Sequence, residues 1–277
     1  MNILITGATG FVGSHLYSAL RQNHELFVLT RKSSNVKDIS PDHFIEFSGD
    51  VDALTSYMIE KHIDGVIHLA TKYVAEHKSD DIKDLVLSNI LLGTYVLEAA
   101  TNAKVSWFIN TGTIWQNYNV PDYSDEYCPV NLYAASKQAF MTMAKYYTEI
   151  SPIKFTTLKL CDTYGPNDTR RKIMDLFAEN AMTGDVLEMS AGEQLIDIVH
   201  IDKVIKAFKS LIDILSDSTA PYRNEYVVTS NRQITLKELA FEYERQHNVK
   251  LNIEWGKRPY RKREVMKPYK GVAVPMQ

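Results

Sequence analysis

The chain begins Met1-Asn-Ile-Leu-Ile-Thr-Gly7-Ala-Thr-Gly10-Phe-Val-Gly13, and this stretch decides the fold. Residues 3–5 form a short apolar run that predicts a buried strand, and a helix-like stretch, 14–20, follows the glycines. Glycines let the backbone turn tightly and approach a ligand, while the first N–H groups of a helix are free to bind an anion. We therefore predict a pyrophosphate site at Gly7, Thr9, Gly10, Phe11, Val12 and Gly13.

Strand and helix signals alternate through the first two thirds of the chain. Further strands are predicted at residues 26–29, 44–47, 66–69, 107–110 and 155–160, with the clearest helical patterns at 81–100 and 132–150. This alternation predicts an α/β fold, with a doubly wound parallel sheet and helices on both faces. After residue 165 the segments become shorter and more mixed. We therefore expect a dinucleotide-binding domain over 1–165 and a smaller, interleaved C-terminal substrate-binding lobe over 166–277.

Composition and charge exclude several classes of protein. The 277 residues are 45% hydrophobic and 23% charged, with a net charge of −3 that gives no general attraction to nucleic acid or to an anionic membrane. No apolar run reaches the ~20 residues of a membrane helix, and no basic and apolar leader is visible. The two cysteines, Cys128 and Cys161, have no metal-type spacing. We expect a cytoplasmic protein with free thiols and no metal site.

The sequence Tyr133-Ala-Ala-Ser-Lys137 supplies a candidate catalytic pair. Residues four apart on a helix share one face. A lysine ammonium near a phenol favours phenolate, so we predict that Lys137 lowers the pKa of Tyr133 from about 10 toward the working pH. Tyr133 is then the candidate general acid that protonates a forming alkoxide. The alternative is a partly exposed helix face, because this spacing also arises by chance.

The Gly-x-x-Gly-x-x-Gly spacing after Thr6, followed downstream by Tyr-x-x-x-Lys, resembles the extended short-chain dehydrogenase/reductase superfamily. The resemblance spans nearly the whole chain and implies a Rossmann fold and a nicotinamide cofactor. It also implies a catalytic hydroxyl at the end of the fifth strand, where Thr113 matches best and Thr111 is the fallback. Such a hydroxyl can hydrogen-bond the substrate carbonyl, although turn chemistry beside Gly112 also explains both threonines.

The resemblance assigns further residues to the cofactor. It implies that Asp50, with Val51 beside it, contacts adenine, and that Lys137 holds the nicotinamide ribose. It makes His68 a packed core histidine rather than a base, and Asn89 mainly structural. The remaining cofactor contacts that it implies are at Leu69, Ala70, Thr111 and Tyr133.

The segment Thr30-Arg-Lys-Ser-Ser34, after the second strand, bears on cofactor choice. NAD sites place an acidic residue there to accept the ribose 2′-OH, whereas the first carboxylate after Thr30 in this chain is Asp38. Arg31 and Lys32 can instead bind a 2′-phosphate. We predict NADPH, with NAD as the alternative if this is a solvated basic loop.

The C-terminal lobe resembles that of nucleotide-sugar enzymes. Ala70-Thr-Lys-Tyr73 and Gly192-Glu-Gln194 look closest to the CDP-abequose and CDP-paratose synthases, which implies reduction of a CDP-4-keto-3,6-dideoxyhexose-like substrate in deoxysugar and O-antigen biosynthesis. Ile196 replaces an arginine that often binds the nucleotide diphosphate in such enzymes. The substrate contacts are therefore expected at Lys72, Thr113, Asp162, Arg170, Lys172 and Arg261.

Other activities stay open as alternatives. Dehydration is disfavoured, because Ile114-Trp115 follows Thr113 where dehydratases of the superfamily usually carry Asp-Glu. A 4-epimerase that retains NAD and a non-catalytic NADPH-binding regulator are the alternatives to a reductase. By analogy, residues 81–100 and 132–150 are expected to form a homodimer interface. Residues 272–277 look like a foreign or a truncated ending, so we expect the last helix of the family to be missing.

Overall fold

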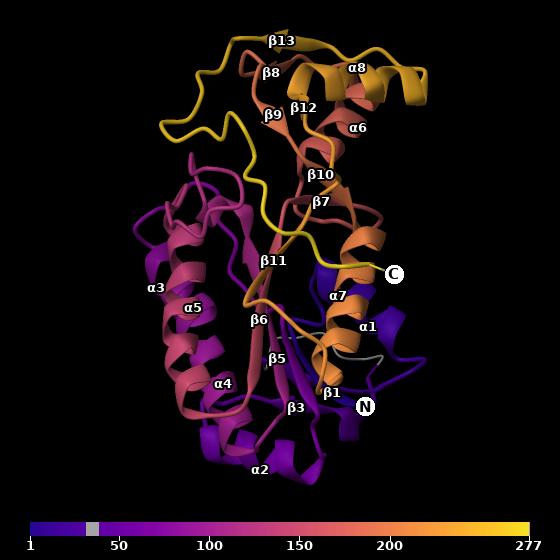
Figure 1. Ribbon diagram of the computed structural model, residues 1–277. Helices are drawn as coiled ribbons and strands as arrows, with labels where there is room; N and C mark the ends of the chain where they lie inside the picture. Colours follow the sequence, from indigo (N-terminus) through magenta and orange to yellow (C-terminus); the bar gives the residue numbers. More distant parts are fainter. Residues whose placement is uncertain (32–38, 277) are drawn as a thin grey trace.

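The computed structural model describes residues 1–31 and 39–276 and is built around a seven-stranded sheet (Figure 1). The sheet has the strand order β11-β6-β5-β4-β1-β2-β3, and every neighbouring pair is parallel. Its strands are β1 (Asn2–Thr6), β2 (Glu25–Thr30), β3 (Phe44–Glu46), β4 (Gly65–His68), β5 (Trp107–Thr113), β6 (Lys154–Leu160) and β11 (Glu225–Val228). This confirms the predicted α/β fold, and the strand order reverses between β1 and β4, where such folds bind ligands.

Helices cover both faces of the sheet (Figure 1). One face carries α1 (Phe11–Leu20) and α7 (Ile201–Ser216). The other carries α2 (Val51–Glu60), α3 (Asp81–Val86), a π-helical turn η2 (Leu87–Leu91), α4 (Leu92–Asn102) and α5 (Leu132–Ile150). No helix in the described ranges is both long enough and apolar enough to span a membrane.

Alternate residues of the strands enter the two cores. In β1, Ile3 and Ile5 pack beneath α1 and α7, whereas Leu4 packs beneath α2 and α4, and all three are fully buried. Burying such a side chain contributes roughly 1.5–3 kcal/mol. Helix α4 approaches α5 closely at Gly93, where a Cβ would lie 2.8 Å from the Phe140 ring. The predicted helix over 81–100 is therefore present, but it is interrupted by η2.

A smaller lobe sits above the carboxyl ends of the strands (Figure 1). It has its own apolar core, centred on Phe177. Three two-stranded sheets pair β7 (Asp162–Tyr164) with β10 (Ile198–His200), β8 (Leu187–Met189) with β13 (Ile253–Trp255), and β9 (Leu195–Ile196) with β12 (Ile234–Thr235). Two helices, α6 (Ile173–Thr183) and α8 (Leu236–His247), complete the lobe. Two short 3-10 turns, η1 (Pro41–His43) and η3 (Ile114–Gln116), lie elsewhere in the chain.

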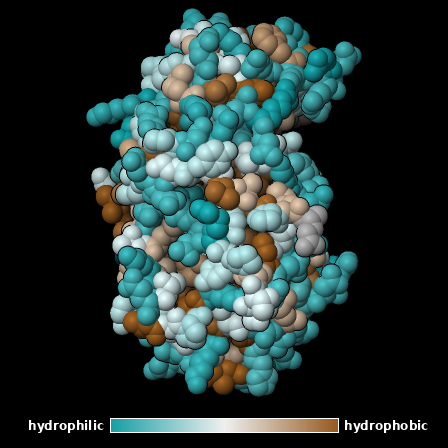
Figure 2. All heavy atoms as spheres, viewed as in Figure 1, coloured by the Kyte–Doolittle hydropathy of each residue, from teal (hydrophilic) through white to brown (hydrophobic). Residues whose placement is uncertain are grey.

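The chain crosses between the lobe and the sheet more than once. Helix α7 and strand β11 lie within residues 166–277, yet both pack in the sheet domain, with β11 paired to β6. Val227 N–H donates to the Val272 carbonyl at 2.8 Å, and Val274 is buried in the core that contains α7. Residues 272–274 thus pack along the edge strand β11. In the view of Figure 2, hydrophilic side chains cover most of the surface.

Candidate active site

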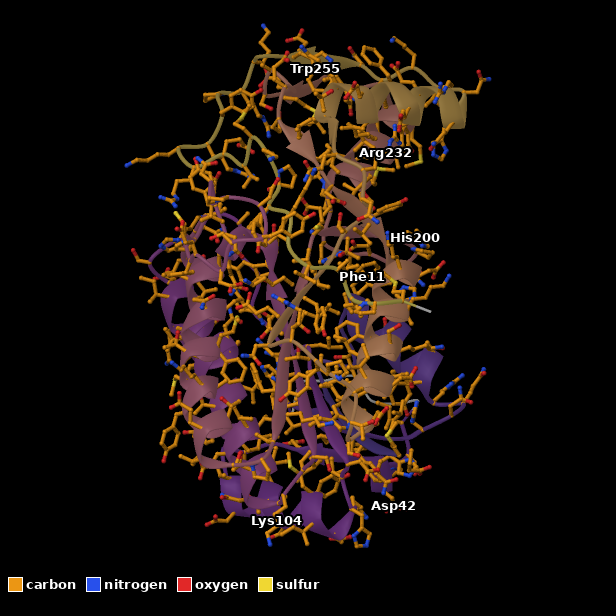
Figure 3. All side chains as sticks on the ribbon, viewed as in Figure 1. Phe11, Asp42, Lys104, His200, Arg232 and Trp255 are labelled. Carbon is orange, nitrogen blue, oxygen red and sulfur yellow. The ribbon has the colours of Figure 1, made fainter. Side chains whose placement is uncertain are left out.

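A cavity of about 540 Å³ lies at the carboxyl ends of the central strands, where the lobe meets the sheet. Figure 3 shows Phe11 on this side of the sheet, whereas Asp42 and Lys104 lie at the opposite end. Most of the predicted site residues line the cavity. They are Gly7, Thr9, Gly10, Phe11, Val12, Gly13, Arg31, Leu69, Ala70, Thr111, Thr113, Tyr133, Asp162, Arg170 and Lys172.

The glycine-rich turn between β1 and α1 has the shape of an anion cradle. Gly7 has a φ of +72°, and a Cβ on it would lie 2.7 Å from the Ala70 nitrogen. A Cβ on Gly13 would lie 2.1 Å from the Gly7 carbonyl oxygen. Gly10 is the N-cap of α1 and provides no side-chain hydrogen bond to its first turn. The turn therefore has room for a pyrophosphate against helix N–H groups, and these residues fit a dinucleotide.

Hydrogen bonds join β1 to β4 beneath the cavity. Thr6 Oγ1 lies 2.8 Å from His68 Nδ1 and accepts from the Ala70 N–H at 3.1 Å. His68 is fully buried, and its ring packs 5.5 Å from that of Phe140. Burial, together with the nearby charge of Lys137, lowers the pKa of His68 to about 3. His68 is thus a neutral, packed histidine.

The start of α5 places Tyr133 against the cavity. Asn131, the N-cap of α5, accepts from the Ala134 N–H at 3.0 Å and donates to the Ala75 carbonyl at 2.8 Å. Tyr133 follows two residues later and is buried in the same wall as Thr113. Lys137 lies one turn further along α5; it is 2% exposed and does not line the cavity. Sequence reasoning missed Asn131, although Asn before a helix is a familiar N-cap signal.

The pKa shift of Tyr133 is opposite to the predicted one. Burial raises the pKa of the Tyr133 phenol above 10, the nearby Tyr73 raises it further, and a hydrogen bond with Thr71 opposes the rise. Burial also lowers the pKa of Lys137 to about 8. Desolvation of the phenolate is the largest cause of the Tyr133 shift, and sequence spacing does not reveal it. Tyr133 is therefore a protonated phenol at neutral pH, as a proton donor must be.

Two threonines at the end of β5, Thr111 and Thr113, line the cavity. Thr113 Oγ1 accepts from the Trp115 N–H at 3.3 Å, while the Thr113 N–H donates to Gln116 Oε1 at 2.9 Å. The Thr113 hydroxyl proton can therefore point to a ligand. Thr111 Oγ1 is buried and has no hydrogen-bond partner among the described residues. A buried hydroxyl without a partner is costly, so Thr111 also suits a ligand contact.

Several predicted residues lie outside this cavity. Asp50 is the N-cap of α2 and accepts from the Ala53 N–H at 2.9 Å, and neither Asp50 nor Val51 is in the wall. Lys72 and Arg261 do not line the cavity either. Lys72 Nζ lies 3.6 Å from Asp81 Oδ1, and Arg261 Nε lies 2.8 Å from Glu76 Oε1. Lys32 lies outside the described residues. Within the described ranges, no group of three or more His, Cys, Asp or Glu side chains is placed to hold a metal ion.

Aromatic rings form the wall beside Tyr133. The centroid of the Tyr73 ring lies 5.2 Å from that of Tyr133 and 6.0 Å from that of Trp115. Lys172 Nζ lies 5.6 Å above the Tyr73 ring and 2.9 Å from Asp162 Oδ1. The sequence analysis did not assign Tyr73 or Trp115 to the site. Tyr73 ends the quoted Ala70–Tyr73 stretch, which was the available signal.

Asn89 fixes the loop that carries Tyr73. Its Oδ1 accepts from the Thr71 hydroxyl at 2.9 Å and from the Lys72 N–H at 2.8 Å. Its Nδ2 donates to the Lys72 carbonyl at 3.0 Å and to Ser136 Oγ at 2.8 Å. The side chain therefore ties η2 and this loop to α5. Asn89 has a structural role, as the resemblance implied.

Comparison with known proteins agrees with this geometry. The chain is 29% identical to CDP-abequose synthase of Yersinia pseudotuberculosis over 272 residues, 97% of this chain and 92% of the relative. UDP-glucose 4-epimerase of Thermotoga maritima, solved with UDP-glucose, superposes with a TM-score of 0.82 at 22% identity, covering 98% of this chain and 89% of that chain. The dTDP-glucose 4,6-dehydratase of Streptomyces venezuelae, solved with NAD, gives 0.80 at 20% identity, covering 100% and 92%. Residues 3–222 match the NAD dependent epimerase/dehydratase family, and the chain belongs to this family of extended short-chain dehydrogenases/reductases.

Proposed function

We propose that the protein is an NADPH-dependent reductase of a nucleotide-linked 4-keto sugar, of the CDP-4-keto-3,6-dideoxyhexose type, in deoxysugar and O-antigen biosynthesis. The observation that carries this proposal is the meeting of Thr113 and Tyr133 with the glycine-rich turn in one cavity. A proton donor beside a dinucleotide cradle suits hydride chemistry at a carbonyl. Similarity to CDP-abequose synthase over almost the whole chain supports the substrate class.

The residues divide the reaction among them. Bound NADPH would supply the hydride that converts the 4-keto group to an alcohol. Tyr133 gives its phenol proton to the carbonyl oxygen as that oxygen becomes negative, and the Thr113 hydroxyl donates a hydrogen bond to the same oxygen. Lys137, with a pKa lowered to about 8, is still mostly protonated at pH 7. Its charge stabilises the phenolate that remains on Tyr133.

Arg31 supports NADPH over NAD. It follows β2 and lines the cavity at the end where the ribose 2′ position of a dinucleotide is expected. A guanidinium pairs well with a dianionic phosphate, whereas an acidic residue would be needed for the 2′-OH. NAD remains the alternative cofactor.

On the substrate side, Asp162 and Lys172 line the cavity beside Tyr73, and we propose that they contact the nucleotide sugar. Lys72 and Arg261 are proposed as further contacts at its edge. The outer surface of α5 exposes Met143, Tyr146 and Ile150, each more than 40% exposed. Together with the helical segment 81–100, this surface is the proposed interface of a cytoplasmic homodimer.

Two alternatives differ from a reductase in a measurable way. A 4-epimerase would retain NAD through turnover and purification, and a non-catalytic regulator would bind NADPH without oxidising it. The test is a panel of nucleotide 4-keto sugars with NADPH oxidation followed optically. Oxidation that depends on one sugar supports the reductase. A tightly held NAD after purification, with no net oxidation of NADPH, would support the epimerase instead.

A further inference from the structure

Arg170 lies between β7 and α6. Hydrogen bonds along one edge of its guanidinium hold the side chain in one orientation. Nε donates to Asp168 Oδ1 at 2.7 Å, and Nη2 donates to Asp168 Oδ2 at 2.6 Å and to the Thr163 carbonyl at 2.9 Å. The Asp168 side chain is only 3% exposed. Burial alone would raise the pKa of Asp168, but the hydrogen bonds from Arg170 hold it below its usual range. Asp168 is therefore an ionised carboxylate that orients Arg170.

The oriented guanidinium lies over the ring of Phe11, at the end of the glycine-rich turn. Its central carbon is 4.5 Å from the ring centroid of Phe11, the first residue of α1. His15, one turn further along α1, has Nε2 at 2.9 Å from the Pro166 carbonyl. The segment 166–170 of the lobe is thus tied at two points to the first turns of α1. Figure 3 shows Phe11 at the level where the lobe begins.

One side of Arg170 is available to a ligand. Arg170 lines the cavity together with Gly10 and Gly13, whereas Asp168 does not line it. Within the described ranges, Nη1 of Arg170 has no hydrogen-bond partner, because Asp168 and Thr163 bind only Nε and Nη2. The ion pair of Arg170 and Asp168 has no net charge, but its positive member, Arg170, lies at the cavity.

We propose that Arg170 binds the pyrophosphate of the dinucleotide and completes, from the lobe, the anion site that the N-terminus of α1 begins. Guanidinium N–H groups and helix N–H groups are the two donor sets that phosphate oxygens favour. This proposal rests on the proposed function, because it assumes that the cavity takes a nicotinamide dinucleotide. It assigns Arg170 to the cofactor, whereas the sequence analysis expected it at the substrate.

The neighbouring cations provide a contrast. Arg171 is 70% exposed, pairs with Glu179 and does not line the cavity. Lys172 lines the cavity but pairs with Asp162, and its Nζ lies over the Tyr73 ring rather than over Phe11. Arg171 is therefore a matched control, with the same residue type one position along the chain.

The test measures ADP-ribose binding by calorimetry to the wild type, Arg170→Gln and Arg171→Gln. ADP-ribose has the pyrophosphate but lacks the nicotinamide and the 2′-phosphate, so it reports on this contact separately from Arg31. Loss of a charge-assisted hydrogen bond should weaken binding about 10- to 100-fold in Arg170→Gln. Binding to Arg171→Gln should stay within about twofold of the wild type, because surface ion pairs contribute little.

The outcomes separate this inference from the proposed function. If the wild type binds neither ADP-ribose nor NADPH, the proposed function fails. If the wild type and Arg170→Gln bind ADP-ribose equally, only the assignment of Arg170 is overturned. It is also overturned if Arg170→Gln binds ADP-ribose normally but CDP more weakly, since Arg170 would then serve the substrate. Arg170→Lys, which keeps the charge but not the planar fork, should give an intermediate loss and covers the case in which Arg170→Gln does not fold.

Discussion

Replacing Lys137 by methionine should stabilise the protein while abolishing most of its activity. Burial lowers the pKa of Lys137 from 10.5 to about 8, and the side chain is 2% exposed. Each pKa unit corresponds to 1.36 kcal/mol, so holding the charge in this position costs about 3 kcal/mol at pH 7. Methionine has a similar length and no charge to desolvate. Lys137→Met should therefore raise the free energy of unfolding at pH 7 by about 1–3 kcal/mol.

The sign of the pH dependence follows from proton binding. Between pH 8 and 10.5 the folded protein has lost the Lys137 proton while the unfolded chain still holds it. The unfolded state then binds more protons, so wild-type stability from this group rises with pH. The advantage of Lys137→Met should accordingly fall to roughly half at pH 9.5 and vanish above about 10.5.

Urea unfolding of the wild type and Lys137→Met at pH 7 and pH 9.5 measures this difference. Lys145→Met is the matched control, because Lys145 lies on the same helix but is 75% exposed and forms a surface ion pair with Glu149. The control should show no pH-dependent gain. A Lys137→Met variant that is less stable than the wild type at pH 7, or a difference that does not change with pH, would refute the reasoning.

Three further substitutions test the proposed site. Tyr133→Phe should lose about 10²- to 10⁴-fold in kcat while NADPH still binds, because only the proton donor is removed; near-normal turnover would show that Tyr133 is not the acid. Arg31→Ala should weaken NADPH binding by roughly 1.5–3 kcal/mol and leave NADH little changed, since only NADPH has the 2′-phosphate; titration with both cofactors measures this, and an equal loss for both would contradict it. Arg261→Ala should raise KM for the nucleotide sugar about two- to fivefold with little change in kcat, because its contact is exposed and equal in ground and transition states. An unchanged KM would remove Arg261 from the substrate site.

Local sequence patterns predicted the helices and strands that are determined by residues close together in the sequence. The apolar run before Gly7 became β1, and the helix Leu132–Ile150 has the predicted ends. Strand β5 was predicted to end at residue 110, but Thr111 and Thr113 also belong to it. They extend β5 to the cavity. Strand β11 was missed, although Glu225–Val228 contains an apolar run, because its pairing with β6 depends on the whole chain.

Sequence spacing could bring two candidate site residues together where one helix carries both of them. It could not give contacts between distant segments or the effect of burial on a pKa. Tyr133 and Lys137 share α5, so spacing alone placed them together. The contacts of Tyr73 with Tyr133, and of Arg170 with Phe11, join segments far apart in the sequence. The direction of the Tyr133 pKa shift was missed because desolvation is a property of the folded environment.

Burial shifts the pKa values of Tyr133 and Lys137, the proposed catalytic pair, in opposite directions, and this suits the proposed reduction. It raises the pKa of Tyr133 and lowers that of Lys137, so each pKa shifts toward the neutral form, although Lys137 still carries its charge at pH 7. In the proposed reaction Tyr133 gives up its proton and becomes a phenolate. Lys137 lies one turn further along α5, and its positive charge then stabilises this anion. The rate should therefore decline as pH rises through about 8, where Lys137 loses its charge, rather than near 10. A pH profile of kcat that is flat to pH 10 would show that the charge of Lys137 does not stabilise the phenolate.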